Sequence, residues 1–534
     1  MNKLFTGLLW GISLTVGAQA LPSTEKRSEQ APEKKSAIQI RKLQLAEFAI
    51  TNLYVDEVNE EELVENAIKG MLEKLDPHSA YSNAKEVKRM NEPLQGNFEG
   101  VGIQFNMMED TLLVIQPISD GPSERAGILA GDRIVCVNDT AIAGVKMNQE
   151  EIMRRIRGPK GSKVKLGVLR RGIEEKLYFT VIRDKIPLHT LDAAYMIRKG
   201  IGYIRLGSFG ANTHQEFTEA MKQLKKKGMK DLILDLQGNG GGYLSAAVEI
   251  AGEFLNAGEL IVYTEGERSP RQEFKAEEKG SFRKGQIIVL IDEYSASAAE
   301  IVTGAIQDQD RGIVVGRRSF GKGLVQRPIN LPDQSMIRLT VARYYTPAGR
   351  CIQKPYDEGK KEYNNDIRNR LNHGELTHAD SIQFPDSLQF KTLKQGRTVY
   401  GGGGIMPDHF VPLDTTRFNS FHQQLFSKGI HITASLHYVE RNRTKILETY
   451  KDFEQFEKEF EVPEELLINL KEEADKAKIK YDEAQYQEAL PEIALRLKAL
   501  IARDLWKINE YFRIINESTP SIRKAIDLLT VKKK

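Results

Sequence analysis

The chain has 534 residues, of which 77 are Lys or Arg and 74 are Asp or Glu, so its formal net charge is +3. This balance excludes the basic stripe of a nucleic-acid-binding protein and gives no support to a strongly acidic substrate. The length exceeds one typical hydrophobic core, so we expect three or four domains with the ordinary hydrophobic content of 40%.

The first 20 residues have the pattern of a cleaved export signal. Lys3 supplies a short basic start, residues 4–16 are apolar, and residues 18–20 form an Ala-x-Ala cleavage pattern. An uncleaved membrane anchor is the alternative, although the apolar stretch is short for a ~20-residue span. No cysteine follows the cleavage site to carry a lipid. We therefore expect an exported, periplasmic protein that is soluble after cleavage or peripherally associated with a membrane.

The next two segments predict a leader and a helical region. Residues 21–36 are polar and charged, which is typical of a flexible leader. Residues 37–96 predict helices, the first of which carries an apolar stripe formed by Leu43, Leu45, Phe48 and Ala49. Such a stripe belongs to a core or to a dimer surface, so a homodimer is left open.

Between residues 97 and 185 the pattern changes to short strands and turns that resemble a PDZ domain. The motifs are Gly100-Val101-Gly102-Ile103, residues 112–115, residues 123–128 and residues 131–138. The resemblance implies a module that adds an extended peptide to a sheet edge and binds its terminal carboxylate on loop N–H groups. Gly100, Val101, Gly102 and Ile103 are where this loop would lie. A Gly-x-Gly pattern by itself is more often a plain turn.

Residues 186–415 predict a layered α/β domain, because strand patterns alternate with helix patterns. The strands are expected at 202–206, 231–236 and 286–291, and the helices around 217–224 and 246–251. Residues 356–397 are rich in charged residues and Asn, which indicates a long insertion or a flexible loop.

Residues 416–534 are expected to form a helical C-terminal domain. Apolar residues recur at spacings of three and four, namely Ile446, Tyr450, Phe453, Phe456 and Phe460. Residues 464–500 continue this pattern with interleaved Lys and Glu. These helices are expected to present solvated faces over a shared core, and a dimer contact is the alternative.

The candidate nucleophile is Ser297. The strand at 286–291 ends at small residues and turns into a helix, which places Ser297 at a helix N-terminus among unpaired backbone N–H groups. A serine hydroxyl needs a base, and a lysine can serve once burial brings its pKa down from ~10.4 toward neutrality. Lys322 lies between two glycines, and Gln326 follows on the same face of an extended segment as a candidate orienter.

A purely structural interpretation of the same residues exists. Ser297 and Glu300 have the spacing of a capping box, and Ser295 could be an ordinary cap. A glycine-flanked lysine such as Lys322 is more often a loop charge. The two interpretations are compatible, because a nucleophile can also begin a helix.

Two places offer backbone donors for the oxyanion that forms when a serine attacks a carbonyl. The Ala298 N–H lies just inside the helix start, and the run Gly240-Gly241-Gly242 follows the strand at 231–236. Each preorganised donor lowers such a barrier by ~3 kcal/mol. The alternative for any one glycine is a strand-to-helix turn that needs positive φ.

Separate motifs resemble those of the C-terminal processing (tail-specific) peptidases, a family of Ser/Lys proteases. They span about residues 40–415 in family order and comprise residues 75–81, 100–103, 234–242, 295–300, 319–326, 345–350 and 404–408. The resemblance implies that Ser297 is the nucleophile, Lys322 the base and Gln326 the orienting amide. For the oxyanion hole it favours Gly242, then Gly241.

The chain departs from the family pattern at two positions. Gln237 stands where arginine is usual, and Ala299 stands where a second serine is frequent. Neither position is in the proposed dyad. The departures concern local support of the glycine run and of the first helical turn.

We therefore expect a multidomain α/β protein. It comprises a helical N-terminal region, a PDZ-like β-rich domain, a core of the crotonase (Clp protease) form implied by the resemblance, and a helical C-terminal region. The predicted function is an exported serine endopeptidase that cleaves proteins or peptides recognised through free C-termini, with an adaptor protein left open. The alternatives are a non-catalytic PDZ scaffold on an inactive peptidase fold and an acyl-CoA enzyme, because fold alone does not decide function.

No cofactor or metal is expected, because no Cys/His cluster has zinc spacing. The two cysteines, Cys136 and Cys351, lie far apart in the chain, and two separate buried thiols are expected.

Overall fold

The computed structural model describes residues 32–108, 110–118, 120–382, 384–414 and 419–531. The chain divides into two units, residues 1–71 and 72–534, each described here by itself. The predicted export signal and most of the predicted leader lie outside the described residues. Within the described ranges, no helix has the length and apolar character needed to cross a membrane.

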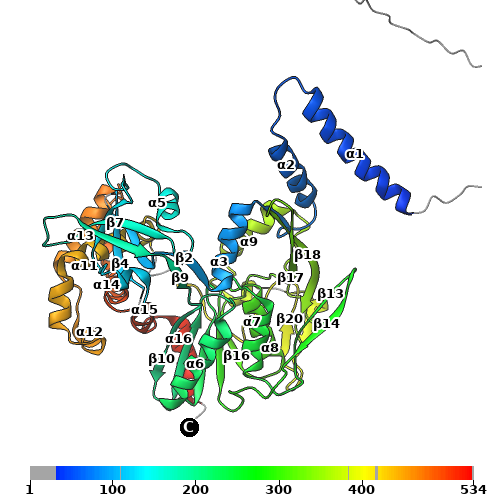
Figure 1. Cartoon of the computed structure of the whole chain (residues 1–534). Helices are drawn as coiled ribbons and strands as arrows, with labels where there is room; N and C mark the ends of the chain where they lie inside the picture. Colours follow the sequence, from blue (N-terminus) through cyan, green and yellow to red (C-terminus); the bar gives the residue numbers. More distant parts are fainter. Residues whose placement is uncertain (1–31, 109, 119, 383, 415–418, 532–534) are drawn as a thin grey trace, which may run out of the picture. The chain divides into compact units, whose positions relative to one another are not determined.

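The first unit is helical (Figure 1). Helix α1 (Pro32–Leu53) begins before the expected residue 37, and α2 (Glu60–Glu73) starts in this unit and runs past its end. The predicted apolar stripe is exposed, because Leu43, Leu45 and Phe48 retain 51%, 58% and 60% of their accessible surface.

A six-stranded antiparallel sheet forms the β-rich part of the second unit. Its order is β3-β4-β5-β7-β8, with β6 paired to β5, so β3 is an edge strand. Its elements are β3 (Ile103–Met108), β4 (Thr111–Pro117), α4 (Pro122–Arg125), β5 (Arg133–Val137), β6 (Thr140–Ala141), α5 (Gln149–Ile156), β7 (Lys163–Leu169) and β8 (Leu177–Ile182). The chain enters and leaves this sheet through the antiparallel pair β2 (Asn97–Gly100) and β9 (Asp184–Pro187).

The central sheet of the second unit has the order β10-β11-β12-β15-β16-β21, and all pairs after β10-β11 are parallel. Its strands are β10 (Leu191–Arg198), β11 (Ile201–Leu206), β12 (Asp231–Asp235), β15 (Ile287–Ile291), β16 (Ile313–Gly316) and β21 (His409–Phe410). Every residue of β12 and β15 is buried, as expected for a parallel sheet covered on both faces. The predicted α/β core is confirmed.

Helices cover both faces of this sheet. Leu232 and Leu234 share a core with the helices α6 (Thr213–Lys226), α7 (Leu244–Gly252) and α8 (Ala298–Asp308). Ile233, which points the other way, packs in a separate cluster with Ile522 and Leu529 of α16 (Pro520–Val531). The last helix of the chain therefore closes the second face of the sheet.

A second sheet lies at the base of the predicted site and has the order β1-β18-β13-β14, with β17 paired to β18. Its strands are β1 (Ala80–Ser82), β13 (Leu260–Gly266), β14 (Ser269–Lys275), β17 (Leu324–Asn330) and β18 (Met336–Tyr345). Helix α3 (Ala84–Gln95) follows β1 and begins with a capping box between Asn83 and Glu86.

The flexible-loop interpretation of residues 356–397 is wrong. This segment contains α9 (Lys360–Asn372), two short 3-10 turns (Ala379–Ser381 and Asp386–Leu388) and the hairpin β19 (Gln389–Lys391) and β20 (Thr398–Tyr400). Side chains of α9 anchor it to the core, because Arg370 is 3% exposed and donates to the carbonyl oxygens of Ser319 and Phe320. Charge in this segment therefore serves buried hydrogen bonding.

The C-terminal region is helical, as expected, and its helices share a core. They are α10 (Ser420–Ser427), α11 (Ile430–Thr449), α12 (Phe453–Glu459), α13 (Glu464–Lys476), α14 (Glu483–Leu505) and α15 (Ile508–Ile515). Helix α16 packs instead on the central sheet. The apolar run from Ile446 to Phe460 is split by residues 450–452, and the charged run is split by residues 477–482. In both places the periodicity continues across a break because both flanking helices face the same core.

The two cysteines are unpaired. Cys136 is buried in β5, whereas Cys351 is only partly buried. Burial raises the pKa of the Cys351 thiol.

Candidate active site

Ser297 occupies a sharp turn between β15 and α8. Its backbone has φ 56° and ψ −113°, a conformation that is uncommon for a residue with a side chain and costs about 1–3 kcal/mol. Its carbonyl oxygen accepts from Ile301 N–H at 3.0 Å and from the Tyr344 hydroxyl at 3.1 Å. Surrounding hydrogen bonds therefore hold the strained turn in place.

Ser295 does not cap the helix. Its hydroxyl donates to the Leu236 carbonyl at 2.8 Å, and it accepts from the Asp292 N–H at 3.0 Å. Ser295 thus fastens the turn to the end of the neighbouring strand β12.

The buried carboxylate of Glu300 joins the Ser297 turn to the Lys322 loop. Its Oε2 accepts from the backbone N–H of Ser297 at 2.8 Å and of Lys322 at 2.9 Å. Its Oε1 accepts from Gly321 N–H at 2.7 Å and from the Ser319 hydroxyl at 2.5 Å. Glu300 is 0% exposed, and this burial raises its pKa while the four donors act in the opposite direction.

The Lys322 loop packs closely against other backbone, as its two glycines suggest. Gly321 has φ +88°, and a Cβ there would lie 3.0 Å from Gly404 N. A Cβ on Gly323 would lie 2.9 Å from Gln353 N. The buried Tyr344 hydroxyl bonds to the carbonyl oxygens of both Ser297 and Lys322, which gives the two segments a second shared anchor.

The surroundings of Lys322 favour its neutral form. Burial lowers the pKa of Lys322, and the Arg338 guanidinium lowers it further, whereas Glu300 and Asp76 act in the opposite direction. Among the described residues, none forms a hydrogen bond or an ion pair with the Lys322 amine. A buried amine without an acidic partner is the state that a general base requires.

His78 also lies in this environment. Burial and the charge of Lys322 lower the pKa of His78 to about 4, and its Nε2 lies 2.7 Å from the Tyr363 hydroxyl. His78 is therefore neutral near pH 7.

The glycine run lies against Ser297. A Cβ on Gly241 would come within 2.8 Å of Ser297 Cβ and within 3.0 Å of Ala298 N, so only glycine fits here. The Gly241 N–H donates to Asn239 Oδ1 at 2.8 Å and is already occupied. The N–H groups of Gly242 and Ala298 donate to no described residue. Of the three predicted oxyanion donors, two are therefore available.

Gln326 lies in β17 and pairs with Thr340 of β18. Its amide donates to the Leu324 carbonyl at 3.2 Å and makes a long contact of 3.4 Å with the Thr340 hydroxyl. No hydrogen bond joins it to Lys322 in the described part of the chain. Its orienting role stays a prediction.

The predicted carboxylate-binding loop precedes the edge strand β3. The carbonyl oxygens of Val101 and Gly102 accept from the N–H groups of Ser123 and Ile118, both at 3.0 Å. Their own N–H groups donate no hydrogen bond within the described ranges. Gly100 and Ile103 flank them in β2 and β3. The loop therefore has free donors at the start of an open sheet edge.

The sequence did not predict the roles of several site residues. Glu300 was assigned only a capping role, although its carboxylate also holds the loop of Lys322. Tyr344 and Arg338 carried no local signal, because their roles depend on strands that are distant in sequence. Asn239 lies within the motif at 234–242, but no role was predicted for its side chain. Asp76 and His78 lie within the motif at 75–81, but their position beside Lys322 follows only from the pairing of β1 with β18.

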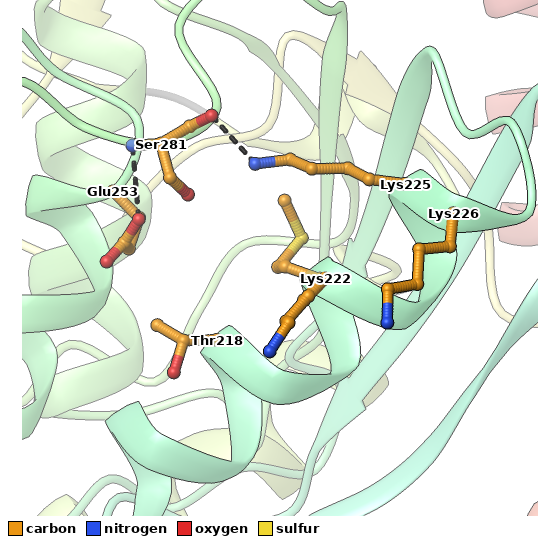
Figure 2. Close-up of a pocket in the computed structure, with 7 residues that line it drawn as sticks. Thr218, Lys222, Lys225, Lys226, Glu253 and Ser281 are labelled. Carbon is orange, nitrogen blue, oxygen red and sulfur yellow. Dashed lines mark hydrogen bonds between the residues drawn. The ribbon is translucent and has the colours of Figure 1, made fainter.

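No described group of three or more His, Cys, Asp or Glu side chains is arranged to hold a metal ion. A separate open hollow of about 520 Å³ lies between α6 and the loop at Ser281 (Figure 2). Lys222, Lys225 and Lys226 line it, and Lys225 Nζ donates to the Ser281 carbonyl at 2.8 Å. None of the predicted site residues lines this hollow.

Comparison with protein-family models assigns four segments. Residues 200–359 match peptidase family S41, residues 100–181 match a PDZ domain, and residues 5–86 match the N-terminal domain of the activating protease CtpB. Residues 421–507 match a family of unknown function, DUF8443.

Two curated relatives and one solved structure are similar to the chain. A carboxy-terminal-processing protease of Bartonella bacilliformis is 36% identical over 65% of this chain and 78% of the relative. Carboxy-terminal processing protease CtpB of Bacillus subtilis is 34% identical over 59% of this chain and 65% of the relative. The solved photosystem II D1 C-terminal processing protease is 29% identical, with a TM-score of 0.34, over 58% of this chain and 83% of that chain.

Replacing Glu300 with Gln should loosen both segments that it joins. An amide has one acceptor oxygen, so two of the four donors lose their partner, at about 1–3 kcal/mol for each buried group. We expect a lower free energy of unfolding and faster amide hydrogen exchange in peptides covering residues 295–301 and 319–323, measured by mass spectrometry.

Glu293→Gln is the matched control, because Glu293 is also buried but bonds to Arg317. It should leave exchange at Gly321 and Lys322 unchanged. Wild-type exchange of both segments in Glu300→Gln would contradict the joining role.

Proposed function

Because the chain belongs to the carboxy-terminal processing proteases, we propose that it is a serine endopeptidase with Ser297 as nucleophile and Lys322 as general base. The observation that carries this proposal is Glu300, whose one carboxylate binds the backbone of both residues. The strained turn at Ser297 and the unpaired, buried amine of Lys322 support it.

In the proposed reaction, the Lys322 amine takes the hydroxyl proton of Ser297 as Ser297 Oγ attacks the peptide carbonyl. The carbonyl oxygen becomes an anion and accepts from the N–H groups of Gly242 and Ala298. The Lys322 ammonium then gives its proton to the leaving amine. Water, deprotonated by the same amine, hydrolyses the acyl-enzyme and restores Ser297.

Substitution of either dyad residue tests this proposal. We expect Ser297→Ala and Lys322→Ala each to lower turnover of a denatured protein by at least ~10³-fold, because neither nucleophile nor base can be replaced. Fragments are quantified by mass spectrometry, and a serine-reactive probe should label Ser297 in the wild type.

Ser427→Ala is the control, and it should keep probe labelling at Ser297, since its hydroxyl donates to the Gln424 carbonyl within α10. A wild-type protein that neither cuts nor reacts with the probe would be the non-catalytic scaffold. Retention of most activity by Lys322→Ala would mean that the base is misassigned.

The pH dependence has a defined sign. Only neutral Lys322 is a base, so kcat/KM should rise with pH through the pKa of Lys322, which lies below its usual 10.5. Arg338→Gln removes a positive charge that lowers this pKa, so the rise should move to higher pH. Asp76→Asn removes a negative charge that raises it, so the rise should move to lower pH.

Arg343→Gln, on the same strand as Arg338, is the control for these pH profiles and should leave the midpoint in place. An unmoved midpoint in Arg338→Gln, or shifts of the same sign in Arg338→Gln and Asp76→Asn, would contradict the assignment of Lys322.

We propose that the PDZ domain selects substrates by their free C-termini. The unoccupied N–H groups of Val101 and Gly102 lie beside the open edge of β3, where an added strand would present its carboxylate. Binding there would move or order the module so that the chain reaches Ser297, or so that Lys322 takes its working position.

C-terminal amidation of a substrate tests this part. We expect a protein with a free C-terminus to be cleaved with a KM about tenfold lower than its amidated counterpart, because a charge-assisted bond is lost. A short internal peptide that does not reach the PDZ domain serves as control and should show no difference. Equal KM values for the two proteins would rule out carboxylate recognition.

Two parts of the proposal concern the first unit. Export follows from the sequence pattern at residues 1–20. A homodimer is supported by α1, whose apolar side chains Ile38, Leu43 and Phe48 are more than half exposed. Adaptor binding remains a prediction without a specific surface.

A further inference from the structure

The glycine run follows Gln237, one of the two residues at which the sequence departs from the family pattern. Asp235 Oδ1 accepts from the Gln237 N–H at 2.9 Å, and Arg205 donates to the Gln237 carbonyl at 2.7 Å. The side-chain oxygen of Gln237 accepts from the Ser521 hydroxyl at 3.0 Å. Every one of these partners is supplied by an element other than the glycine run.

One of these supports, Ser521, belongs to a C-terminal helix, and a second, Arg205 of β11, contacts another C-terminal helix. Ser521 lies in the first turn of α16 and is 3% exposed. The Arg205 guanidinium stacks on the ring of Phe512 in α15, with 4.7 Å to the ring centroid. Its position is further fixed by Asp235, which accepts from Arg205 at 2.6 Å.

The segment from Gln237 to Gly242 is held by hydrogen bonds at Gly238, Asn239 and Gly241. Gly238 N–H donates to Asp292 at 2.9 Å, and the Asn239 carbonyl accepts from Ala296 N–H at 2.9 Å. The Asn239 side chain bonds to Gly241 N–H and to the Leu206 carbonyl, both at 2.8 Å. Gln237 begins this bonded segment, so its own supports help to set where the chain enters the glycine run.

We propose that Ser521 and Phe512 are positioning residues for the oxyanion hole. They hold Gln237 directly and through Arg205, and so keep the Gly242 N–H where the oxyanion forms. This inference rests on the proposed function, since it assumes that Gly242 is a donor in the reaction. It assigns a catalytic support role to the last helices of the chain, which lie outside the segment matched by the S41 model.

A misplaced N–H donor reduces the stabilisation of the transition state more than it reduces the binding of the substrate. Ser521→Ala should therefore lower kcat about 5–10-fold, equivalent to about one hydrogen bond, with KM unchanged. A peptide aldehyde, which forms a tetrahedral adduct on Ser297, should bind more weakly by the same factor. Both are measured per site labelled by the serine-reactive probe, so that unfolded protein does not contribute.

Gln237→Ala should lower kcat by the same factor. The double variant should have a kcat no lower than either single variant, because both substitutions remove the same hydrogen bond between Ser521 and Gln237. Ser518→Ala is the matched control, since its hydroxyl bonds only to the Ile515 carbonyl of its own segment. It should retain wild-type kcat.

Wild-type kcat in Ser521→Ala, additive losses in the double variant, or a rise in KM alone would overturn the inference. These outcomes differ from failure of the proposed function, in which the wild type itself shows neither turnover nor labelling of Ser297.

Discussion

The organisation of this site depends on one buried carboxylate. Glu300 accepts hydrogen bonds from four donors that belong to two separate segments. A buried carboxylate is tolerated only when its oxygens are fully bonded, so neither segment can shift without leaving Glu300 unsatisfied. The uncommon backbone of Ser297 and the close glycine contacts of the Lys322 loop are consequences of this anchor.

The same principle extends from the site to the rest of the chain. The C-terminal helices bond through Ser521 to Gln237, which precedes the glycine run. They also bond to the PDZ sheet through a bidentate ion pair between Arg133 and Glu440. Gln116 of the PDZ sheet donates to the carbonyl oxygens of Asp504 and Trp506. The C-terminal region is thus bonded to both the PDZ sheet and the α/β core.

The local elements could be predicted because their signals are local. The apolar centre of β12 and the all-apolar run of β15 mark buried parallel strands, and the small residues before α8 mark the turn at Ser297. The motifs also brought Ser297 and Lys322 to notice. The sequence pattern could not predict which residues from distant parts of the chain come into contact. Glu300 has the spacing of a cap, and only the arrival of the Lys322 loop turns it into a junction between two segments.

The insertion shows why the remaining error arose. A charged, Asn-rich segment is typical of a flexible loop, yet Arg370 and Lys354 are buried by pairing with Asp366. Pairing partners four residues apart are visible in a sequence, but the carbonyl oxygens that complete the bonding of Arg370 belong to Ser319 and Phe320. Composition shows how many charged residues a segment has, but not whether their side chains find partners in the fold. It therefore cannot distinguish a solvated loop from a segment held by buried hydrogen bonds.

A buried glutamate beside a lysine that is proposed to act as a base is an electrostatic conflict, which other groups offset. Glu300 raises the pKa of Lys322, which by itself would favour the inactive ammonium. The carboxylate, however, is bonded to backbone N–H groups and a hydroxyl, so its charge is dispersed over neutral donors and does not form an ion pair with the amine. Burial and the Arg338 guanidinium act in the opposite direction. Burial and Arg338 together outweigh the effect of Glu300, so the net shift of the Lys322 pKa is downward.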